Sequence, residues 1–287
     1  MALKDLLVCV DQTEHALYRL RAAGDLAARH GSRLTALFAR EWTSGQLERR
    51  KVAELGLVSR EQIHQLDEGI AASIEVVADR LQKTLDELAA DRGIQTSLLS
   101  IDGQAAMAVP QYARYADLCI VGQNEPEGPA SVNYSFSEQL LFVTGRPVLF
   151  VPADRSYETL GRHIVVAWNS SRPAARSLND AMPLIEHADR TTIVMINPAG
   201  FIKSHDGPPA QQLTEHLAHH GVVVDTVQVE NVAPGDIANR LQAEALALGA
   251  DLIVAGAFGH PRLWEKMLGG VTCDLMARMN LPIFMSH

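Results

Sequence analysis

Residues 250–272, ADLIVAGAFGHPRLWEKMLGGVT, determine which fold and which function we expect for this chain. They open with a short apolar run, Asp251–Ala255, which has the length of one buried strand. A tight turn, a helix-like run and two adjacent glycines follow it. Three of the glycines have the spacing Gly-x2-Gly-x9-Gly, and they are Gly256, Gly259 and Gly269. Glycine lets a backbone approach a phosphate closely and turn its N–H groups toward it.

A helix is expected to start directly after these glycines. It runs from about Val271 to Met279, so Gly270 precedes its first turn and the positive end of its dipole faces the loop. The stretch therefore predicts a strand, a phosphate-binding loop and a helix N-terminus in one place. The alternative interpretation is that the glycines only make turns, because a glycine-rich pattern alone also occurs without a phosphate ligand.

The length, charge and hydropathy of the chain exclude several protein classes. A chain of 287 residues has the length of two average domains. Its formal net charge of -9 disfavours general nucleic-acid binding, which requires a basic surface. No apolar run approaches the roughly 20 residues needed to span a bilayer, and the N-terminus lacks the features of a signal peptide. We therefore expect a cytoplasmic protein that has neither nucleic acid nor a membrane as a partner.

Strand-like and helix-like segments alternate along the chain, and the series starts again after a polar linker at Pro152–Arg162. In the first half we expect strands at 6–11, 33–40, 94–101, 117–122 and 147–151, with helices at 12–30, 61–92, 104–115 and 135–144. In the second half we expect strands at 163–169, 191–197, 222–230, 251–256 and 282–286, with helices at 171–187, 210–220, 236–248, 263–268 and 271–279. This alternation indicates parallel sheets with helices on both faces.

The two halves also share sequence motifs, which indicates an internal repeat. Ala116–Gly122 aligns with Ala250–Gly256, and Arg146–Phe150 aligns with Leu281–Met285. Ligands of doubly wound parallel sheets bind outside the carboxyl ends of the strands, at the point where the strand order reverses. The glycine-rich stretch directly follows such a strand, so a ligand site is expected there.

The glycine pattern resembles the nucleotide loop of the universal stress protein family, Gly-x2-Gly-x9-Gly-Ser/Thr. This chain has Gly270 at the Ser/Thr position, and Thr272 supplies a hydroxyl two residues later. The resemblance covers the whole chain as two tandem copies, which we place at residues 1–152 and 162–287. It implies an α/β fold with a doubly wound, five-stranded parallel sheet in each copy, of the adenine-nucleotide alpha hydrolase-like type. It also implies that the copies meet near their last strands as an intramolecular pseudo-dimer, and a homodimer of the whole chain is a further option.

The resemblance also implies which residues contact a nucleotide. Asn169 ends the first strand of the second half, where the family usually has an Asp beside the ribose and adenine. Asn197 ends the next strand, where backbone groups bind the adenine edge, and Phe258 in the glycine turn either covers the ligand or packs in the core. His260 either contacts a phosphate or is a simple loop residue. The full predicted nucleotide set is Asn169, Asn197, Gly256, Phe258, Gly259, His260, Gly269, Gly270, Val271 and Thr272.

The first half does not keep the glycine loop. Gly122 is followed by Gln-Asn-Glu-Pro-Glu-Gly-Pro, and Glu125 stands near where a second glycine is needed. The carboxylates of Glu125 and Glu127 would repel a phosphate. Asp11 keeps the acid of the family's first strand, but without the loop it is expected to cap a helix. We therefore expect nucleotide binding to depend on the second half only.

These features favour a stress-associated regulatory protein that binds ATP, with or without Mg2+, and contacts an unidentified protein partner. A second hypothesis is a partner-binding protein that has lost the nucleotide, because Gly270 and Asn169 both depart from the family pattern. A third is an adenylyl-transferring enzyme. No general base or acidic metal cluster is recognisable, so we expect no catalytic residue and at most slow, incidental ATP hydrolysis. His216 and His220 are spaced like a metal pair, but no further ligand completes a site, and a solvated surface pair is expected.

Overall fold

The computed structural model describes residues 2–40, 60–102, 104–123, 139–153, 157, 159–200, 209–258 and 270–287. The first half contains β1 (Asp5–Val10), α1 (His15–His30), β2 (Arg33–Arg40), α3 (Arg60–Arg92), β3 (Thr96–Asp102), α4 (Ala105–Ala113), β4 (Leu118–Gly122) and β5 (Val148–Val151). A short helical segment at 139–143 precedes β5. The second half contains β6 (His163–Ala167), α6 (Arg172–Ile185), β7 (Arg190–Ile196), a 3-10 turn (Pro198–Gly200), α7 (Pro209–His219), β8 (Val224–Val229), a second 3-10 turn (Pro234–Asp236), α8 (Ile237–Ala247), β9 (Leu252–Gly256), α9 (Val271–Ala277) and β10 (Ile283–Ser286).

These elements agree with those predicted from the sequence. Each predicted strand is present, and its ends lie within about two residues of the predicted bounds. The main difference among the helices is α1, which begins at His15 rather than at residue 12 because a turn follows β1. The predicted helix at 135–144 is described only from residue 139 onward, and the predicted helix at 263–268 lies outside the described residues.

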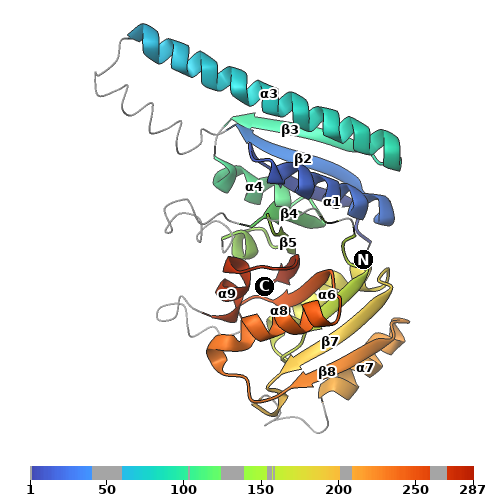
Figure 1. Cartoon of the computed structure of the whole chain (residues 1–287). Helices are drawn as coiled ribbons and strands as arrows, with labels where there is room; N and C mark the ends of the chain where they lie inside the picture. Colours follow the sequence, from blue (N-terminus) through green and yellow to red (C-terminus); the bar gives the residue numbers. More distant parts are fainter. Residues whose placement is uncertain are drawn as a thin grey trace.

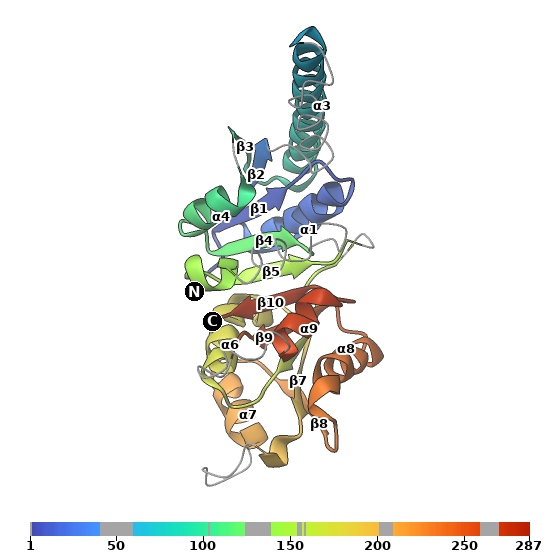
Figure 2. The ribbon, with the colours of Figure 1, turned by 90° about the vertical axis from the view of Figure 1, so that its left-hand side faces the viewer.

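The strands of the described residues form one ten-stranded sheet in the order β3-β2-β1-β4-β5-β10-β9-β6-β7-β8. All neighbouring strands are parallel except β5 and β10, which are antiparallel, with Ile283 opposite Phe150 and Met285 opposite Val148. Figure 2 shows this pair side by side at the middle of the molecule. Each half is doubly wound, as predicted, and the halves join through their last strands. The division into domains at residues 152 and 162 stays a prediction.

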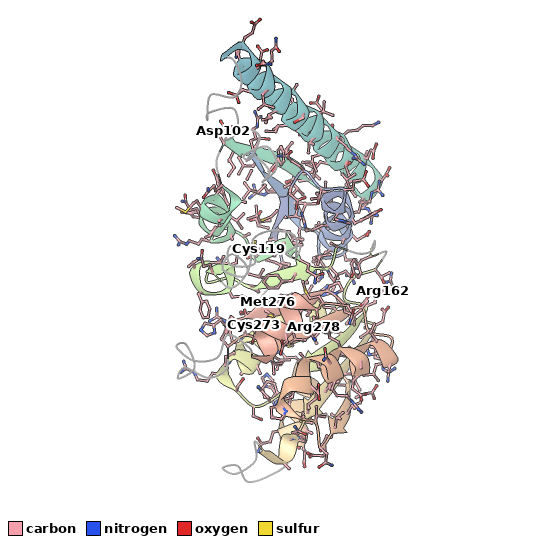
Figure 3. All side chains as sticks on the ribbon, turned by 60° about the vertical axis from the view of Figure 1, so that its left-hand side comes forward. Asp102, Cys119, Arg162, Cys273, Met276 and Arg278 are labelled. Carbon is pink, nitrogen blue, oxygen red and sulfur yellow. The ribbon has the colours of Figure 1, made fainter. Side chains whose placement is uncertain are left out.

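Helices cover both faces of the sheet. On one face, α1, α3, α6 and α7 pack in a single apolar layer that includes Leu20 and Leu178. On the other face, α4, α8 and α9 pack in a second layer. Figure 3 marks this second layer by Cys119 on β4 and Met276 on α9, which lie on either side of the junction between the halves. Because the strands are covered on both faces, they are almost continuously apolar, as in LLVCV of β1.

The long helix α3 lies at one end of the sheet, next to β3 (Figure 1). One face of the helix is apolar at steps of three and four residues, as the sequence predicts. The buried side chains of this face are Ile70, Ile74, Ala78, Leu81, Leu85 and Leu88. The first turns are more exposed and extend past the sheet (Figure 1).

The halves also contact each other where α1 and α6 end. His30 is the last residue of α1, and its ring lies against that of His187, two residues after α6, with ring centroids 4.7 Å apart. The pKa of His30 is lowered from 6.5 to about 4, and the main cause is the burial of its ring. The neighbouring groups His187, Arg29 and Lys4 act in the same direction. This contact therefore favours a neutral His30.

We expect His30 to make the fold less stable in acid. Its pKa is depressed from an ordinary value of 6.5 to about 4 on folding, so its contribution to stability is present above pH 6.5 and is lost as the pH falls toward 4. His30→Gln should reduce the difference in unfolding free energy between pH 7 and pH 5 by about 1–2 kcal/mol. Urea unfolding at both pH values measures this difference. The exposed His219→Gln is the control, and an unchanged pH dependence in His30→Gln would contradict the expectation.

Candidate functional site

In the second half, the strand order reverses between β6 and β9. We call this position the switch point of the second half. β6 lies between β7 and β9, so the segments that leave β6 and β9 diverge at this point and leave room for a ligand. Ala167 of β6 lies opposite Ala255 of β9. Asn169 and Gly256, two residues of the predicted nucleotide set, therefore emerge at the same edge of the sheet.

Asn169 starts a turn that leads into α6. Its side-chain oxygen accepts a hydrogen bond from the N–H of Ser171 at 3.1 Å. Ser171 is the N-cap of α6, and its hydroxyl accepts from the N–H of Ala174 at 3.3 Å. Asn169 itself is exposed. The structure thus places this amide at the strand end, where a ligand in the switch point could contact it.

Gly256 ends β9 directly beneath the first turn of α6. A Cβ placed on Gly256 would lie 2.8 Å from Cα of Ala174 and would also overlap the backbone of Pro173. Backbone atoms cannot move aside as a flexible side chain can. The close packing of α6 on β9 therefore requires glycine here, independently of any phosphate.

Phe258 and Thr272 connect the two ends of the glycine-rich segment. The N–H of Phe258 donates to the hydroxyl oxygen of Thr272 at 3.2 Å. Thr272 is buried in the first turn of α9, which begins at Val271. Phe258 has a φ of 53°, in the left-handed region that bulky residues avoid. The hydroxyl of Thr272 thus fixes the point at which the chain enters the loop.

Gly270 precedes α9 as its N-cap. A Cβ on Gly270 would meet no atom of the described residues within 4 Å. Three residues of the predicted set, Gly259, His260 and Gly269, lie outside the described residues. Their proposed contacts with a nucleotide stay predictions.

An aromatic group packs around Phe258, and one member comes from the first half. The ring of Phe142, in the helical segment 139–143, lies 4.8 Å from that of Phe258, measured between centroids. The ring of His287 lies edge-on to Phe142 at 4.5 Å. Phe258 therefore does pack against other side chains, which was one of the two interpretations of this residue. The sequence analysis missed Phe142, although the expected contact between last strands pointed to the segment before β5.

Asn197 follows β7 and uses its side chain within the fold. Its amide nitrogen donates to the carbonyl of Val232 at 2.7 Å, and its side-chain oxygen accepts from the N–H of Val232 at 3.0 Å. Its φ of 54° is left-handed, a conformation that asparagine tolerates. The side chain thus ties the end of β7 to the segment after β8. Because both polar groups of this side chain bond Val232, a ligand contact at Asn197 would have to come from its backbone, as the resemblance implies.

Comparison with known proteins identifies the fold. No protein-family model and no curated protein matches the sequence. Among solved structures, a universal stress protein from Archaeoglobus fulgidus superposes with a TM-score of 0.68 at 17% sequence identity, covering 98% of this chain and 96% of that chain. A Pseudomonas aeruginosa protein assigned to the universal stress proteins has a TM-score of 0.60 at 14% identity, covering 99% and 93%. This chain has the universal stress protein fold. The likeness extends over nearly the full length of each protein, so it includes both halves.

In the first half of this universal stress protein fold, a buried cation lies at the corresponding strand ends. Arg19 of α1 donates from Nε to the carbonyl of Cys9 at 2.7 Å and from Nη2 to Asp11 at 2.6 Å. Its side chain is only 7% exposed. A Cβ placed on Gly122 would lie 3.0 Å from Arg19 Cζ and closer still to Nη1. In the first half, the guanidinium of Arg19 thus lies beside Gly122. In the second half, the backbone of α6 lies at the corresponding place beside Gly256.

Asp11 does not cap α1, which corrects the expectation from the sequence. The N-cap is Glu14, which makes no side-chain capping bond. Asp11 instead accepts from the N–H of Thr13 at 2.9 Å and pairs with Arg19. Burial alone would raise the pKa of Asp11, but the charge of Arg19 and the hydrogen bonds from Thr13 and Arg19 outweigh it and lower the pKa. The carboxylate is therefore held in its charged form.

The second half replaces both members of this ion pair with neutral residues. The offset of 158 residues that aligns Asp11 with Asn169 also aligns Arg19 with Ser177. The buried positions of the two helices agree with this alignment: Ala16, Arg19, Leu20 and Ala23 match Ala174, Ser177, Leu178 and Ala181. The hydroxyl of Ser177 is buried without a hydrogen-bond partner in the described part of the chain. The switch point of the second half thus lacks the guanidinium that fills the first.

The remaining candidates from the sequence are His216 and His220, which are spaced like a metal pair. The rings of His216 and His220 lie 5.0 Å apart on the surface. Within the described ranges, no group of three or more His, Cys, Asp or Glu side chains is arranged to hold a metal ion. Nor does any described helix combine the length and apolar character needed to cross a membrane.

We expect Gly256→Ala to destabilise the protein by about 1–3 kcal/mol, the usual cost of overpacking. The added methyl group would overlap the backbone of Pro173 and Ala174. Gly270→Ala is the control, because a Cβ there meets no described atom, and the loss of an N-cap glycine should cost less than about 1 kcal/mol. Chemical unfolding of the three proteins measures the effect. Equal stability of Gly256→Ala and the parent would show that α6 does not pack as described.

Proposed function

We propose that this protein binds an adenine nucleotide, ATP with or without Mg2+, in its second half and acts as a stress-associated regulatory protein. The observation that carries the proposal is the hydrogen bond between Phe258 and Thr272. It joins the two described ends of the glycine-rich segment at the switch point, where ligands of doubly wound sheets bind. The exposed amide of Asn169 lies at the end of the neighbouring strand. The shared fold adds support by analogy.

The residues at this edge suit a phosphate group. A Cβ on Gly270 would meet no described atom before α9, and glycine lets backbone N–H groups turn toward a phosphate. We assign the ligand contacts to the predicted nucleotide set, with Asn197 contributing through its backbone. When bound, Mg2+ would balance phosphate charge, but we name no protein ligand for it.

The first half is a poor place for the nucleotide because Arg19 and Asp11 occupy its strand ends. A ligand there would have to displace a hydrogen-bonded ion pair between the buried guanidinium of Arg19 and the half-exposed carboxylate of Asp11. Breaking this pair leaves the buried guanidinium without its carboxylate, which is unfavourable. The site in the second half has no such pair among its described residues. This difference supports the expectation that the second half holds the nucleotide.

The proposal has further parts that concern the whole protein. We propose domains at residues 1–152 and 162–287, a cytoplasmic location and regulation through an unidentified protein partner. No catalytic residue is assigned, and ATP hydrolysis should be slow and incidental.

A second candidate function is a partner-binding protein without a nucleotide. Two observations favour it. The hydroxyl of Thr272 already accepts a hydrogen bond from Phe258, and Asp274 places a carboxylate in the first turn of α9, where it disfavours a phosphate. Native mass spectrometry of freshly purified protein distinguishes the candidates, because a nucleotide-sized mass on the protein supports the first.

We expect Gly270→Ser to strengthen ATP binding about tenfold. The new hydroxyl would stand where the family pattern has Ser or Thr, and a hydrogen bond to a charged group contributes about 1.5–3 kcal/mol. Titration calorimetry with ATP compares the variant with the parent. Gly69→Ser, on the exposed side of α3 in the first half, is the control, because a Cβ there also meets no described atom. If the parent binds ATP and Gly270→Ser gains nothing over it, the missing hydroxyl does not limit affinity.

A further inference from the structure

We infer that Phe142 of the first half is a positioning residue for the nucleotide site of the second half. This inference rests on the proposed function. Phe142 belongs to the helical segment 139–143, which precedes β5. Because β5 and β10 are antiparallel, the start of β5 lies beside the end of β10, with Val148 opposite Met285. β10 is also paired with β9. The segment before β5 therefore reaches the same edge as the glycine-rich stretch.

Among the described residues, the contact between the halves at this edge includes three rings, those of Phe142, Phe258 and His287. Phe142 and Phe258 are tilted by 32° with centroids 4.8 Å apart, within the range of favourable aromatic pairs. His287 packs its edge on Phe142 at 4.5 Å. His287 Nδ1 also lies 3.0 Å from the carbonyl oxygen of Ala257, at hydrogen-bonding distance. The ring of Phe258 and the backbone before it are thus held from outside the glycine-rich segment.

This contact matters because the backbone of Phe258 is strained. A phenylalanine with a φ of 53° persists only where its surroundings hold it. Among the described residues, Phe258 contacts the hydroxyl of Thr272 and the ring of Phe142, and the ring of His287 lies edge-on to it at 6.2 Å. The conformation of Phe258 sets the direction in which the chain leaves β9 and enters the glycine-rich segment. Phe142 therefore contributes to the geometry of a site to which it supplies no ligand contact of its own.

The first test measures hydrogen–deuterium exchange in the full-length protein without nucleotide. Phe142→Ala should speed exchange in the peptide that contains Phe258, because the bond from its N–H to Thr272 loses support. Phe142→Tyr keeps the ring and should behave like the parent. Val143→Ala is the matched control, because it lies on the same helical segment and is 41% exposed. Unchanged exchange at Phe258 in Phe142→Ala would overturn the inference, whatever the protein binds.

The second test measures ATP affinity by calorimetry at a temperature where every variant is folded. Phe142→Ala should weaken binding about three- to tenfold, the range of one aromatic pair, and Phe142→Tyr should restore it. In a Phe258→Ala background the same change should cost nothing more, because Phe142 acts through Phe258. If the parent binds ATP and Phe142→Ala does not alter its affinity, or if the loss is equal in both backgrounds, the inference is wrong. If Phe142→Ala shows faster exchange at Phe258 but the parent binds no ATP, the proposed function is refuted. The role of Phe142 in positioning Phe258 is then still supported.

Discussion

The antiparallel pairing of β5 with β10 is the contact on which the rest of the molecule depends. Each half alone would end in an apolar strand with unpaired N–H and C=O groups, which is a template for unwanted association. Here the two edges pair with each other, and both strands are buried. The pairing also brings each half to the strand ends of the other. Phe142 reaches Phe258 at one edge, and Gln123 donates to the carbonyl of Ala277 at 3.2 Å at the opposite edge. Neither edge is built by one half alone.

The halves differ most clearly in the charges at these strand ends. In the first half, the guanidinium of Arg19 is buried and the carboxylate of Asp11 is half exposed, so loss of Asp11 alone would leave a buried charge without its partner. The second half accordingly has neutral residues at both positions, Asn169 in place of Asp11 and Ser177 in place of Arg19. Taken alone, Asn169 is a departure from the acid of the family pattern that weakens the argument for a ligand. Beside Ser177, it is one member of a paired replacement that removes the guanidinium from the switch point.

The fold could be predicted from the sequence because it depends on patterns among residues close in the chain. Apolar strands alternate with amphipathic helices, and the cap at Ser171 is visible within a few residues. The site depends instead on contacts between distant residues. In the sequence, Arg19 looks like an ordinary helix residue, and only the packing of α1 on β4 shows that it reaches Gly122. The reason for glycine at 256 and the contact of Phe142 with Phe258 likewise arise from helices that pack on strands far along the chain.

Backbone strain gives an independent reason to place function at the carboxyl edge of the second half. Within the described residues, the non-glycine residues with positive φ lie one to three residues after four of its strands, and they are Ser170 after β6, Asn197 after β7, Asn231 after β8 and Phe258 after β9. Asparagine tolerates this conformation, but serine and phenylalanine avoid it. Each such residue costs about 1–3 kcal/mol and needs contacts that hold it, and such residues cluster at ligand sites. The turn from Asn169 to Ser171 encloses Ser170, and the bond to Thr272 holds Phe258. The strained residues of the second half therefore lie at the same strand ends as the proposed site.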